Sequence, residues 1–276
     1  MKRLSGKQSL SVDGHQRTFI LDIPNHISQT TGLILVSHGF GDSAESIRNY
    51  SGFKDTFEKH DFVFAFLEGT KDKAGKPNFQ VEYEFQDKSV DDVRFASAVV
   101  HKLITDLHLD PNSVFATGMS NGADFCYYLA RQEKPIVRAI APVAGTMMTC
   151  WRSLEFTHRP FAIMEVHGTS DSITRWNGDM DNHDHWGAYL GTPSVMDFWI
   201  KALSLEKATT KELRPSHPTK QDNIILNHWA TTHDSSELLL YILGSGEHVW
   251  PTHLADPKKT TAEEILAFFE SHRTTK

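Results

Sequence analysis

The stretch FATGMSNGAD, residues 115–124, holds one serine between two glycines, as Gly118-Met119-Ser120-Asn121-Gly122. The pattern G-x-S-x-G is typical of a sharp strand-to-helix turn that exposes a serine hydroxyl, although it also occurs by chance. The flanking residues therefore decide between a reactive hydroxyl and an ordinary loop serine. An apolar run precedes Ser120 and a helical pattern follows it directly, so the sequence predicts the strand–turn–helix context that the motif requires.

Short apolar runs alternate with amphipathic stretches along the rest of the chain. Runs of this length suit strands that are buried on both faces of a sheet. The predicted strands are 18–24, at the sheet edge, and 32–39, 62–69, 113–120, 136–145, 161–168 and 237–244. The predicted helices are 90–107, 121–132 and 261–272. The alternation predicts an α/β fold with a mostly parallel central sheet and helices on both faces.

We expect a single domain over residues 1–276, because the chain has no internal repeat and no long linker. Two stretches lack periodicity and are rich in polar residues or glycine. They are 170–194 and 205–223, which we interpret as loop insertions in the domain.

The composition narrows the class of protein. The net charge is −7 and basic residues are not clustered, which argues against a nucleic-acid or anionic-membrane partner. No apolar run reaches the roughly 18 residues of a membrane span. The opening MKRLSGKQSL is not a signal peptide, so we expect either a cytoplasmic protein or a secreted one whose signal has been removed. We interpret Cys126 and Cys150 as small core residues, with a single bridge possible if the protein is secreted.

A serine nucleophile needs a histidine base and a carboxylate that orients the base. In folds with this elbow, the chain order is Ser, then Asp or Glu, then His. Asp171 follows the predicted strand 161–168, and His248 follows the predicted strand 237–244. Carboxyl ends of parallel strands meet at one edge of a sheet, so Ser120, Asp171 and His248 should meet there.

Other residues of the same types fit less well. His38 precedes the serine, His167 should pack or hydrogen-bond locally at its strand end, and His183 and His185 follow Asp171 too closely. His253 is the strongest rival base, but it lies further from its strand than His248. The run from Asp181 to His185 carries metal-ligand types without a full ligand spacing, so we predict a polar loop and no metal.

The oxyanion of an acyl-transfer reaction needs backbone donors near the serine. The N–H of Asn121 lies at a helix N-terminus, and the N–H of Phe40 lies in the glycine loop His38-Gly39-Phe40-Gly41 after an early strand. We predict these two as the oxyanion hole. Trp250, two residues after His248, is the candidate for a substrate-binding wall, although packing is its simpler interpretation.

Six segments together resemble a known family. They are HGFGDSA (38–44), DDVRF (91–95), GMSNGA (118–123), APVAG (141–145), HGTSD (167–171) and GEHVWP (246–251). They are similar to the polyhydroxybutyrate depolymerase and feruloyl esterase group of the α/β-hydrolase superfamily, over nearly the whole chain. The resemblance implies an α/β-hydrolase fold and triad roles for Ser120, Asp171 and His248. It also implies a serine esterase acting on hydroxyalkanoate polyesters or on acyl groups of plant polysaccharide.

The sequence thus predicts a serine esterase that hydrolyses short-chain carboxylic esters, takes a small-molecule or oligomeric ester and needs no cofactor. Two alternatives stay open. One is a serine peptidase on the same fold, and the other is a non-catalytic binding protein that kept the fold.

Overall fold

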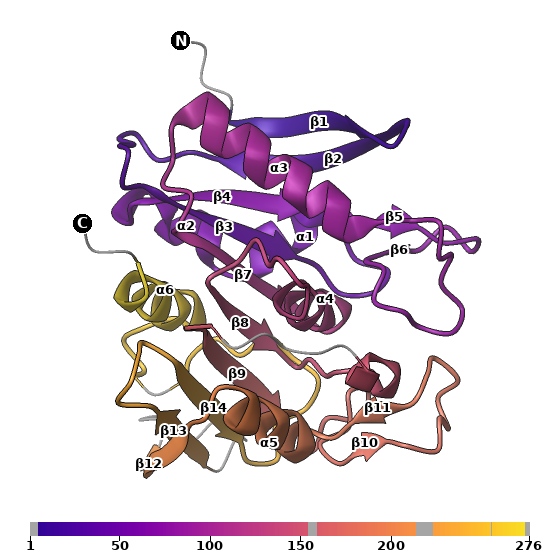
Figure 1. Ribbon diagram of the computed structural model, residues 1–276, viewed down its shortest axis with the longest axis vertical. Coiled ribbons are helices and arrows are strands. Elements are labelled where there is room, and N and C mark those ends of the chain that lie inside the picture. The colour runs from indigo at the N-terminus through magenta and orange to yellow at the C-terminus, as the bar shows by residue number, and fades with distance from the viewer. Residues whose placement is uncertain (1–4, 154–158, 214–222, 255, 274–276) are drawn as a thin grey trace.

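In the computed structural model, which describes residues 5–153, 159–213, 223–254 and 256–273, the apolar runs form one ten-stranded sheet. Its spatial order is β1-β2-β4-β3-β7-β8-β9-β14-β13-β12 (Figure 1). The strands are β1 Gly6–Val12, β2 His15–Asp22, β3 Gly32–Ser37, β4 Phe62–Leu67, β7 Val114–Met119, β8 Ala139–Val143, β9 Ala162–Gly168, β12 Glu206–Leu213, β13 Ile224–Ala230 and β14 Glu237–Leu243.

The middle of the sheet is parallel and its two sides are antiparallel. The strands from β4 to β14 in this order pair in parallel. β1 and β2 pair antiparallel on one side, and β13 and β12 do so on the other. The predicted fold class is therefore confirmed, and the carboxyl ends of the parallel strands share one edge.

Helices cover both faces of this sheet (Figure 1). They are α1 Ala44–Tyr50, α2 Phe53–Thr56, α3 Asp92–Leu107, α4 Asn121–Ala130, α5 Thr192–Ala202 and α6 Thr261–Ser271, with short 3-10 turns η1 Phe57–Lys59 and η2 Thr149–Ser153. Apolar residues of α3, α4 and α5 belong to one buried cluster, and those of α1, α2 and α6 belong to a second. Two-residue ladders, β5 Thr70–Lys71 with β6 Pro77–Asn78 and β10 Gly178–Asp179 with β11 Tyr189–Leu190, lie in the loops.

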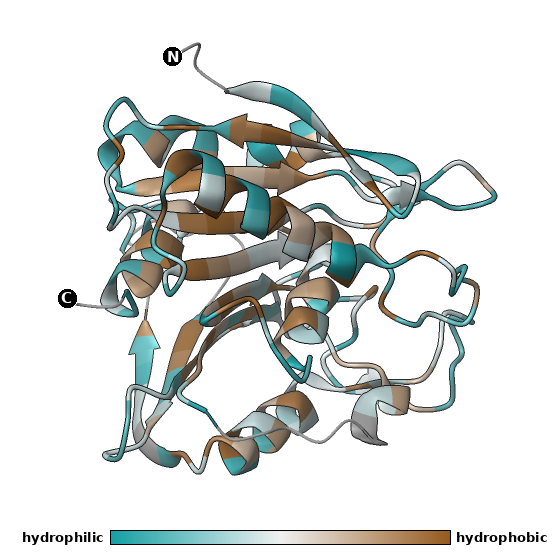
Figure 2. Cartoon of the chain, turned by 45° about the horizontal axis from the view of Figure 1, so that its top comes forward, coloured by the Kyte–Doolittle hydropathy of each residue, from teal (hydrophilic) through white to brown (hydrophobic). Residues whose placement is uncertain are grey.

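Successive residues of one strand belong alternately to the two clusters. In β4, Val63, Ala65 and Leu67 join the first cluster, while the phenylalanines between them join the second. Side chains of a strand alternate between faces, so a strand buried on both faces needs apolar residues at every position. This explains the continuous apolar runs, which Figure 2 shows as hydrophobic central strands.

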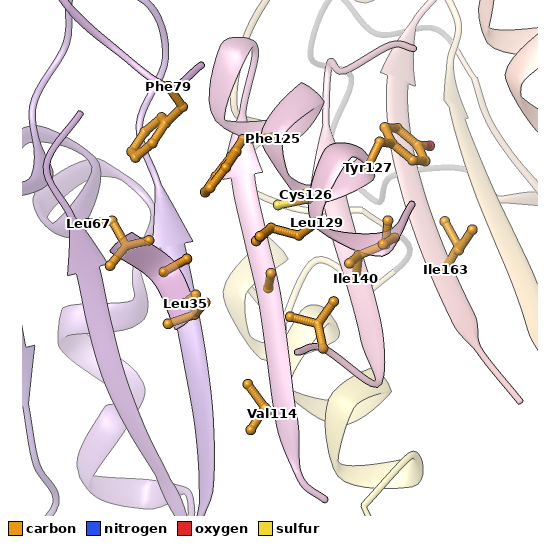
Figure 3. Close-up of a cluster of buried hydrophobic side chains, with 14 of the residues drawn as sticks. Leu35, Leu67, Phe79, Val114, Phe125, Cys126, Tyr127, Leu129, Ile140 and Ile163 are labelled. Atoms are coloured by element: carbon orange, nitrogen blue, oxygen red, sulfur yellow. The ribbon is translucent and has the colours of Figure 1, made fainter. Parts of the chain in front are cut away.

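The first cluster reaches the edge that carries the predicted site. Phe125 of α4 stacks on Phe79, with ring centroids 5.0 Å apart (Figure 3). Cys126 lies in the same cluster as a free, buried thiol. Cys150 is also free but exposed, with Sγ 3.5 Å from a Glu82 carboxylate oxygen, so the prediction that it is a core residue was wrong. It lies on the surface turn η2 rather than under the sheet.

Two predictions from periodicity need correction. The run 18–24 is not an edge strand, because β1 pairs with β2 along its outer side. The loop predicted for 205–223 is a strand, β12, over Glu206–Leu213, while 214–222 lie outside the described residues. Both missed strands are polar, since strands at a sheet edge need few apolar residues. The stretch 170–194 is mostly loop, with β10, β11 and the start of α5 inside it.

Candidate active site

Ser120 is the single residue between the end of β7 and the start of α4, and its backbone takes a conformation found at sharp turns. Its φ is 56° and its ψ is −123°, outside the favourable regions for a non-glycine residue. Its N–H donates to the Val143 carbonyl at 3.0 Å, and its own carbonyl accepts from Ala123 and Asp124 at 2.8 and 2.9 Å. The Ser120 side chain does not cap the helix and is half-exposed. The elbow therefore leaves the hydroxyl available to a ligand.

Gly122 makes this turn possible through close approach. A Cβ at Gly122 would lie 2.1 Å from the Ser37 carbonyl oxygen and 2.6 Å from that of His38. No side chain fits there, because real Cβ contacts under 3.0 Å do not occur. The first turn of α4 thus packs directly on the end of β3, and this contact brings the loop after β3 beside Ser120.

Asp171 lies just past β9 and is 5% exposed. One carboxylate oxygen accepts from the N–H groups of Ile173 and Thr174, at 2.8 and 2.9 Å. The other oxygen lies 2.7 Å from Nδ1 of His248. A carboxylate only accepts, so His248 carries its proton on Nδ1 and presents Nε2 as a lone pair.

The loops that hold Asp171 and His248 are joined by backbone contacts. The Ser170 N–H donates to the Gly246 carbonyl at 2.9 Å, and the Ser245 N–H donates to the Thr169 hydroxyl at 2.9 Å. A Cβ at Gly168 would lie 2.2 Å from the Gly246 oxygen, so the close approach of the loops requires glycine there. The 77-residue separation between acid and histidine is therefore closed by two adjacent strands, β9 and β14.

The loop after β3 places Phe40 at the same edge. Gly39 faces Ser120, since a Cβ on Gly39 would lie 3.5 Å from the Ser120 Cβ. The loop is held by Gly41 N–H donating to the Pro77 carbonyl at 2.7 Å. Within the described residues, neither the Phe40 N–H nor the Asn121 N–H donates a hydrogen bond to the protein. Both are free to bind an anion.

The rival histidines occupy other places. His253 is exposed and its Nδ1 lies 2.9 Å from the Lys259 carbonyl, away from Asp171. His38 is fully buried, and its Nε2 accepts from the Gly69 N–H at 3.0 Å. His183 bonds Asp179 through Nδ1 at 2.9 Å, in the loop that also pairs Arg175 with Asp184. His248 is the histidine that meets Asp171 in a hydrogen bond.

Aromatic residues flank the candidate site. Phe40 is 37% exposed and packs against the exposed ring of Phe85, with centroids 5.5 Å apart. Trp250 is half-buried and packs edge-on against Tyr50 and Phe53, at 6.2 and 5.9 Å. The structure thus places Trp250 against α1 and α2, with part of its indole exposed.

Sequence reasoning expected His167 to pack or hydrogen-bond locally, but it did not single out the other buried polar residues near Asp171. Glu165 and His167 of β9 hydrogen-bond each other at 3.0 Å, and Asp124 of α4 accepts the Thr146 N–H at 2.6 Å. Burial raises the pKa of the Asp124 carboxyl, while its hydrogen bonds with Tyr83 and Thr146 act to lower it. The balance of these effects is a pKa of about 7. The signal was present in FAIMEVHG, where a glutamate interrupts an apolar strand.

Comparison with known proteins shows similarity to proteins named as esterases. No established family profile matches it. It is 24% identical over 230 residues to the esterase candidate NocK of Nocardia uniformis subsp. tsuyamanensis, covering 79% of this chain and 65% of NocK. It is 27% identical over 208 residues to the probable feruloyl esterase C of Aspergillus flavus, covering 69% of this chain and 72% of that protein.

Solved structures agree on the fold. The acetyl xylan esterase of Aspergillus awamori matches with a TM-score of 0.70 at 12% identity, over 96% of this chain and 99% of that one. A Bacillus cereus carboxylesterase matches with a TM-score of 0.58 at 11% identity, over 93% and 94%. In the part of the chain that the structure describes, no helix is both long and apolar enough to cross a membrane. The sheet order and these structural matches show an α/β-hydrolase fold, and the sequence relatives carry the names of esterases.

Proposed function

We propose that the protein hydrolyses short-chain carboxylic esters through an acyl-enzyme on Ser120, with His248 as general base and acid and Asp171 orienting His248. The observation that carries the proposal is the 2.7 Å hydrogen bond between His248 and Asp171, at the edge where Ser120 stands on its elbow. A serine hydroxyl becomes a nucleophile only with such a base, and the base works only in the right tautomer.

In the first half-reaction, Ser120 Oγ attacks the ester carbonyl carbon while its proton passes to Nε2 of His248. The oxyanion that forms accepts hydrogen bonds from the N–H groups of Phe40 and Asn121. Collapse of the tetrahedral intermediate breaks the bond to the alcohol, which takes the proton from His248. Each such donor contributes about 3 kcal/mol to transition-state stabilisation in hydrolases of this kind.

In the second half-reaction, water attacks the acyl-enzyme and gives its proton to His248. The second intermediate collapses to release the carboxylic acid, and the proton on His248 returns to Ser120. Asp171 keeps its charge throughout, which stabilises the imidazolium that forms twice in the cycle. Every step uses side chains, backbone N–H groups and water.

The substrate proposal follows the relatives and the surface. Their names point to feruloyl and acetyl xylan esters, and the sequence also resembles polyhydroxybutyrate depolymerases. Exposed apolar side chains lie on the segments next to the candidate catalytic residues: Phe40, Phe85, Ile173 and Val249. We propose that these side chains and Trp250 contact the ester. A panel of hydroxybutyrate oligomers, methyl ferulate and acetylated xylan would identify the preferred one.

The direct test is Ser120→Ala. It removes one oxygen at a half-exposed turn, so the melting temperature should not change, while kcat on p-nitrophenyl acetate should fall by about 10⁴ to 10⁶. A fluorophosphonate probe should label the wild type and not the variant. If the variant keeps more than a tenth of wild-type activity, Ser120 is not the nucleophile.

Two further results would redirect the proposal. Faster cleavage of peptide anilides than of p-nitrophenyl esters would identify a peptidase. A wild type that neither labels nor hydrolyses would identify a binding protein of hydrolase fold.

A further inference from the structure

A second carboxylate–histidine pair, Glu165 and His167, lies inside β9 beneath the turn that carries Asp171. Both side chains are buried, with exposures of 0% and 1%. Two ionisable groups in an apolar strand are costly to bury unless they pair with each other and satisfy their remaining hydrogen bonds. The pair therefore calls for a reason beyond packing.

The hydrogen bonds indicate where the protons are. Nε2 of His167 lies 2.8 Å from the Thr174 carbonyl, which only accepts, so Nε2 carries a proton. Nδ1 lies 3.0 Å from Glu165. The Glu165 carboxylate also accepts from the Tyr127 hydroxyl at 2.8 Å. Burial raises the pKa of the Glu165 carboxyl, but the hydrogen bond and charge of His167 and the hydrogen bond of Tyr127 oppose that rise and favour the ion pair, in which the second proton lies on Nδ1.

The histidine of this pair touches the acid of the proposed triad. Nε2 of His167 lies 3.7 Å from the Asp171 oxygen that bonds His248. The Thr174 residue whose carbonyl His167 binds also donates its N–H to the other Asp171 oxygen, at 2.9 Å. His167 thus holds the 171–174 turn from inside the sheet and places its charge next to the Asp171 carboxylate.

We propose that Glu165 and His167 form a positioning pair: Glu165 holds His167 as an imidazolium, and His167 anchors the Asp171 turn and offsets its negative charge, which sets the pH at which His248 becomes a base. The inference rests on the proposed roles of Asp171 and His248. Neither residue of the pair touches substrate.

The charges around His167 agree with this role. Burial alone would lower the pKa of His167, but the hydrogen bond and charge of Glu165, the Thr174 carbonyl and the charge of Asp171 outweigh it, and the pKa is raised. Three other titratable groups, all on α4, interact electrostatically with the pair: Asp124, Cys126 and Tyr127. Two more lie one contact further away. Tyr83 hydrogen-bonds Asp124, and His248 hydrogen-bonds Asp171.

The sign of the effect on catalysis follows from charge. A cation beside Asp171 opposes uptake of a proton by His248, so it keeps His248 neutral to lower pH. Without that cation, His248 should bind its proton at higher pH. The acidic limb of the kcat/KM profile reports this protonation in the free enzyme.

The test is the pH profile of His167→Gln. The glutamine amide can still donate to the Thr174 carbonyl, but it carries no charge. We expect the acidic limb to move upward by about half a pH unit or more, which lowers kcat/KM about threefold at pH values below the limb. The maximal kcat should stay within about tenfold of wild type. Glu165→Gln should shift the limb in the same direction.

His272→Gln is the matched control. His272 is also buried between a backbone carbonyl, that of Phe268 at 2.8 Å, and a glutamate, Glu237 at 3.2 Å. It lies at the opposite end of β14 from His248, so its loss should lower stability without moving the pH profile. If His167→Gln also leaves the limb in place, the pair is merely structural and the inference is wrong.

Anchoring is tested separately by His167→Asn. The shorter side chain can still reach Glu165 but not the Thr174 carbonyl. It should lower kcat more than His167→Gln does, while KM changes little, because the 171–174 turn loses its support. Equal kcat values for the two variants would contradict the anchoring role.

Nuclear magnetic resonance separates this inference from the proposed function and needs no variant to be active. In the wild type at pH 7.5, the side-chain nitrogens of His167 should both be protonated, and the His248 ring should titrate at lower pH than it does in His167→Gln. A neutral His167 ring would overturn the inference even if esters are hydrolysed. A wild type without esterase activity would instead overturn the proposed function and leave the His248 titration as the decisive measurement.

Discussion

At Asp171, three hydrogen bonds converge on one small side chain. The N–H groups of Ile173 and Thr174 bind one oxygen, and Nδ1 of His248 binds the other. The turn fixes the direction of the carboxylate, and the carboxylate fixes the ring of His248. A single residue therefore decides both the tautomer and the orientation of the proposed base.

Asp171→Asn tests that dependence. The amide keeps the shape of the side chain, but its NH₂ group can face Nδ1 only if His248 moves its proton to Nε2, where the base needs a lone pair. In hydrolases with such a triad this change lowers kcat by about 10⁴. We expect a loss of that size at pH 7 to 8, measured on p-nitrophenyl acetate.

The control is Asp179→Asn, in the second aspartate–histidine pair of the same region. Asp179 is buried and bonds His183 at 2.9 Å, away from the elbow. Its substitution should leave kcat within a few-fold of wild type. Equal losses in the two variants would show that Asp171 acts through stability rather than through His248.

Trp250 is the residue for which packing and function compete. Its ring rests on Tyr50 and Phe53, yet part of it stays exposed two positions after His248. If it forms one wall of a short acyl pocket, acetate and butyrate esters should be cleaved faster than decanoate esters. Trp250→Ala should flatten that preference, measured as kcat/KM on p-nitrophenyl esters of increasing chain length.

Trp229→Ala is the comparison for this variant, since Trp229 is a half-buried tryptophan on β13. It should leave the chain-length profile unchanged. A wild-type optimum at long chains would overturn the short pocket, and an unaltered profile in Trp250→Ala would remove Trp250 from it.

At the scale of elements, the contact between α4 and β3 sets the geometry of the elbow. The first turn of α4 lies so close to the end of β3 that a Cβ at Gly122 would overlap the Ser37 and His38 carbonyls. This close approach also brings the N-terminus of α4 next to the loop after β3, where a Cβ on Gly39 would lie 3.5 Å from the Ser120 Cβ. The strained backbone of Ser120 persists because the strand, helix and loop around it leave no other arrangement.

Gly122→Ala should break this contact. The added methyl group would overlap the Ser37 carbonyl, so either the backbone must separate or the variant fails to fold. We expect a loss on the order of 3 kcal/mol in the free energy of unfolding or more, measured by urea denaturation. Gly39→Ala is the control, because its Cβ would meet Ser120 at an ordinary 3.5 Å, and its stability should stay near that of wild type.

At the scale of the whole molecule, a buried polar network beneath the site links the stability of the fold to pH. Asp124 is buried, and its pKa is raised by burial from 3.8 to about 7. Between these values, the unfolded chain releases the Asp124 proton while the folded protein keeps it. The free energy of unfolding should therefore fall as the pH rises from about 4 to about 7, and this group adds no further change above that.

Asp124→Asn isolates this contribution. The amide matches the protonated acid in shape and can still accept the Thr146 N–H. The variant should lose less stability than wild type over the same pH range, measured by urea denaturation at pH 4.5, 6 and 7.5. A wild-type slope identical to that of the variant would mean that Asp124 titrates at its ordinary value.

The sequence by itself determined the parts of this protein that depend on local pattern. Apolar runs of strand length predicted the parallel core strands, since strands buried on both faces need apolar residues throughout. The glycines around Ser120 predicted a tight elbow, and chain order predicted which acid and which histidine follow strands at the same edge. The fold is confirmed by the sheet, while the catalytic roles stay a prediction.

Only the tertiary structure decided which distant groups meet. The pairing of β9 with β14 places Asp171 against His248 across 77 residues, and it leaves His253 with Lys259 instead. It also buries Glu165 and His167 beneath Asp171, and it covers β2 with a polar edge strand that periodicity missed. Hydrophobic pattern reports how deeply a residue is buried, whereas hydrogen-bond partners depend on which strands become neighbours, and that is a property of the whole sheet.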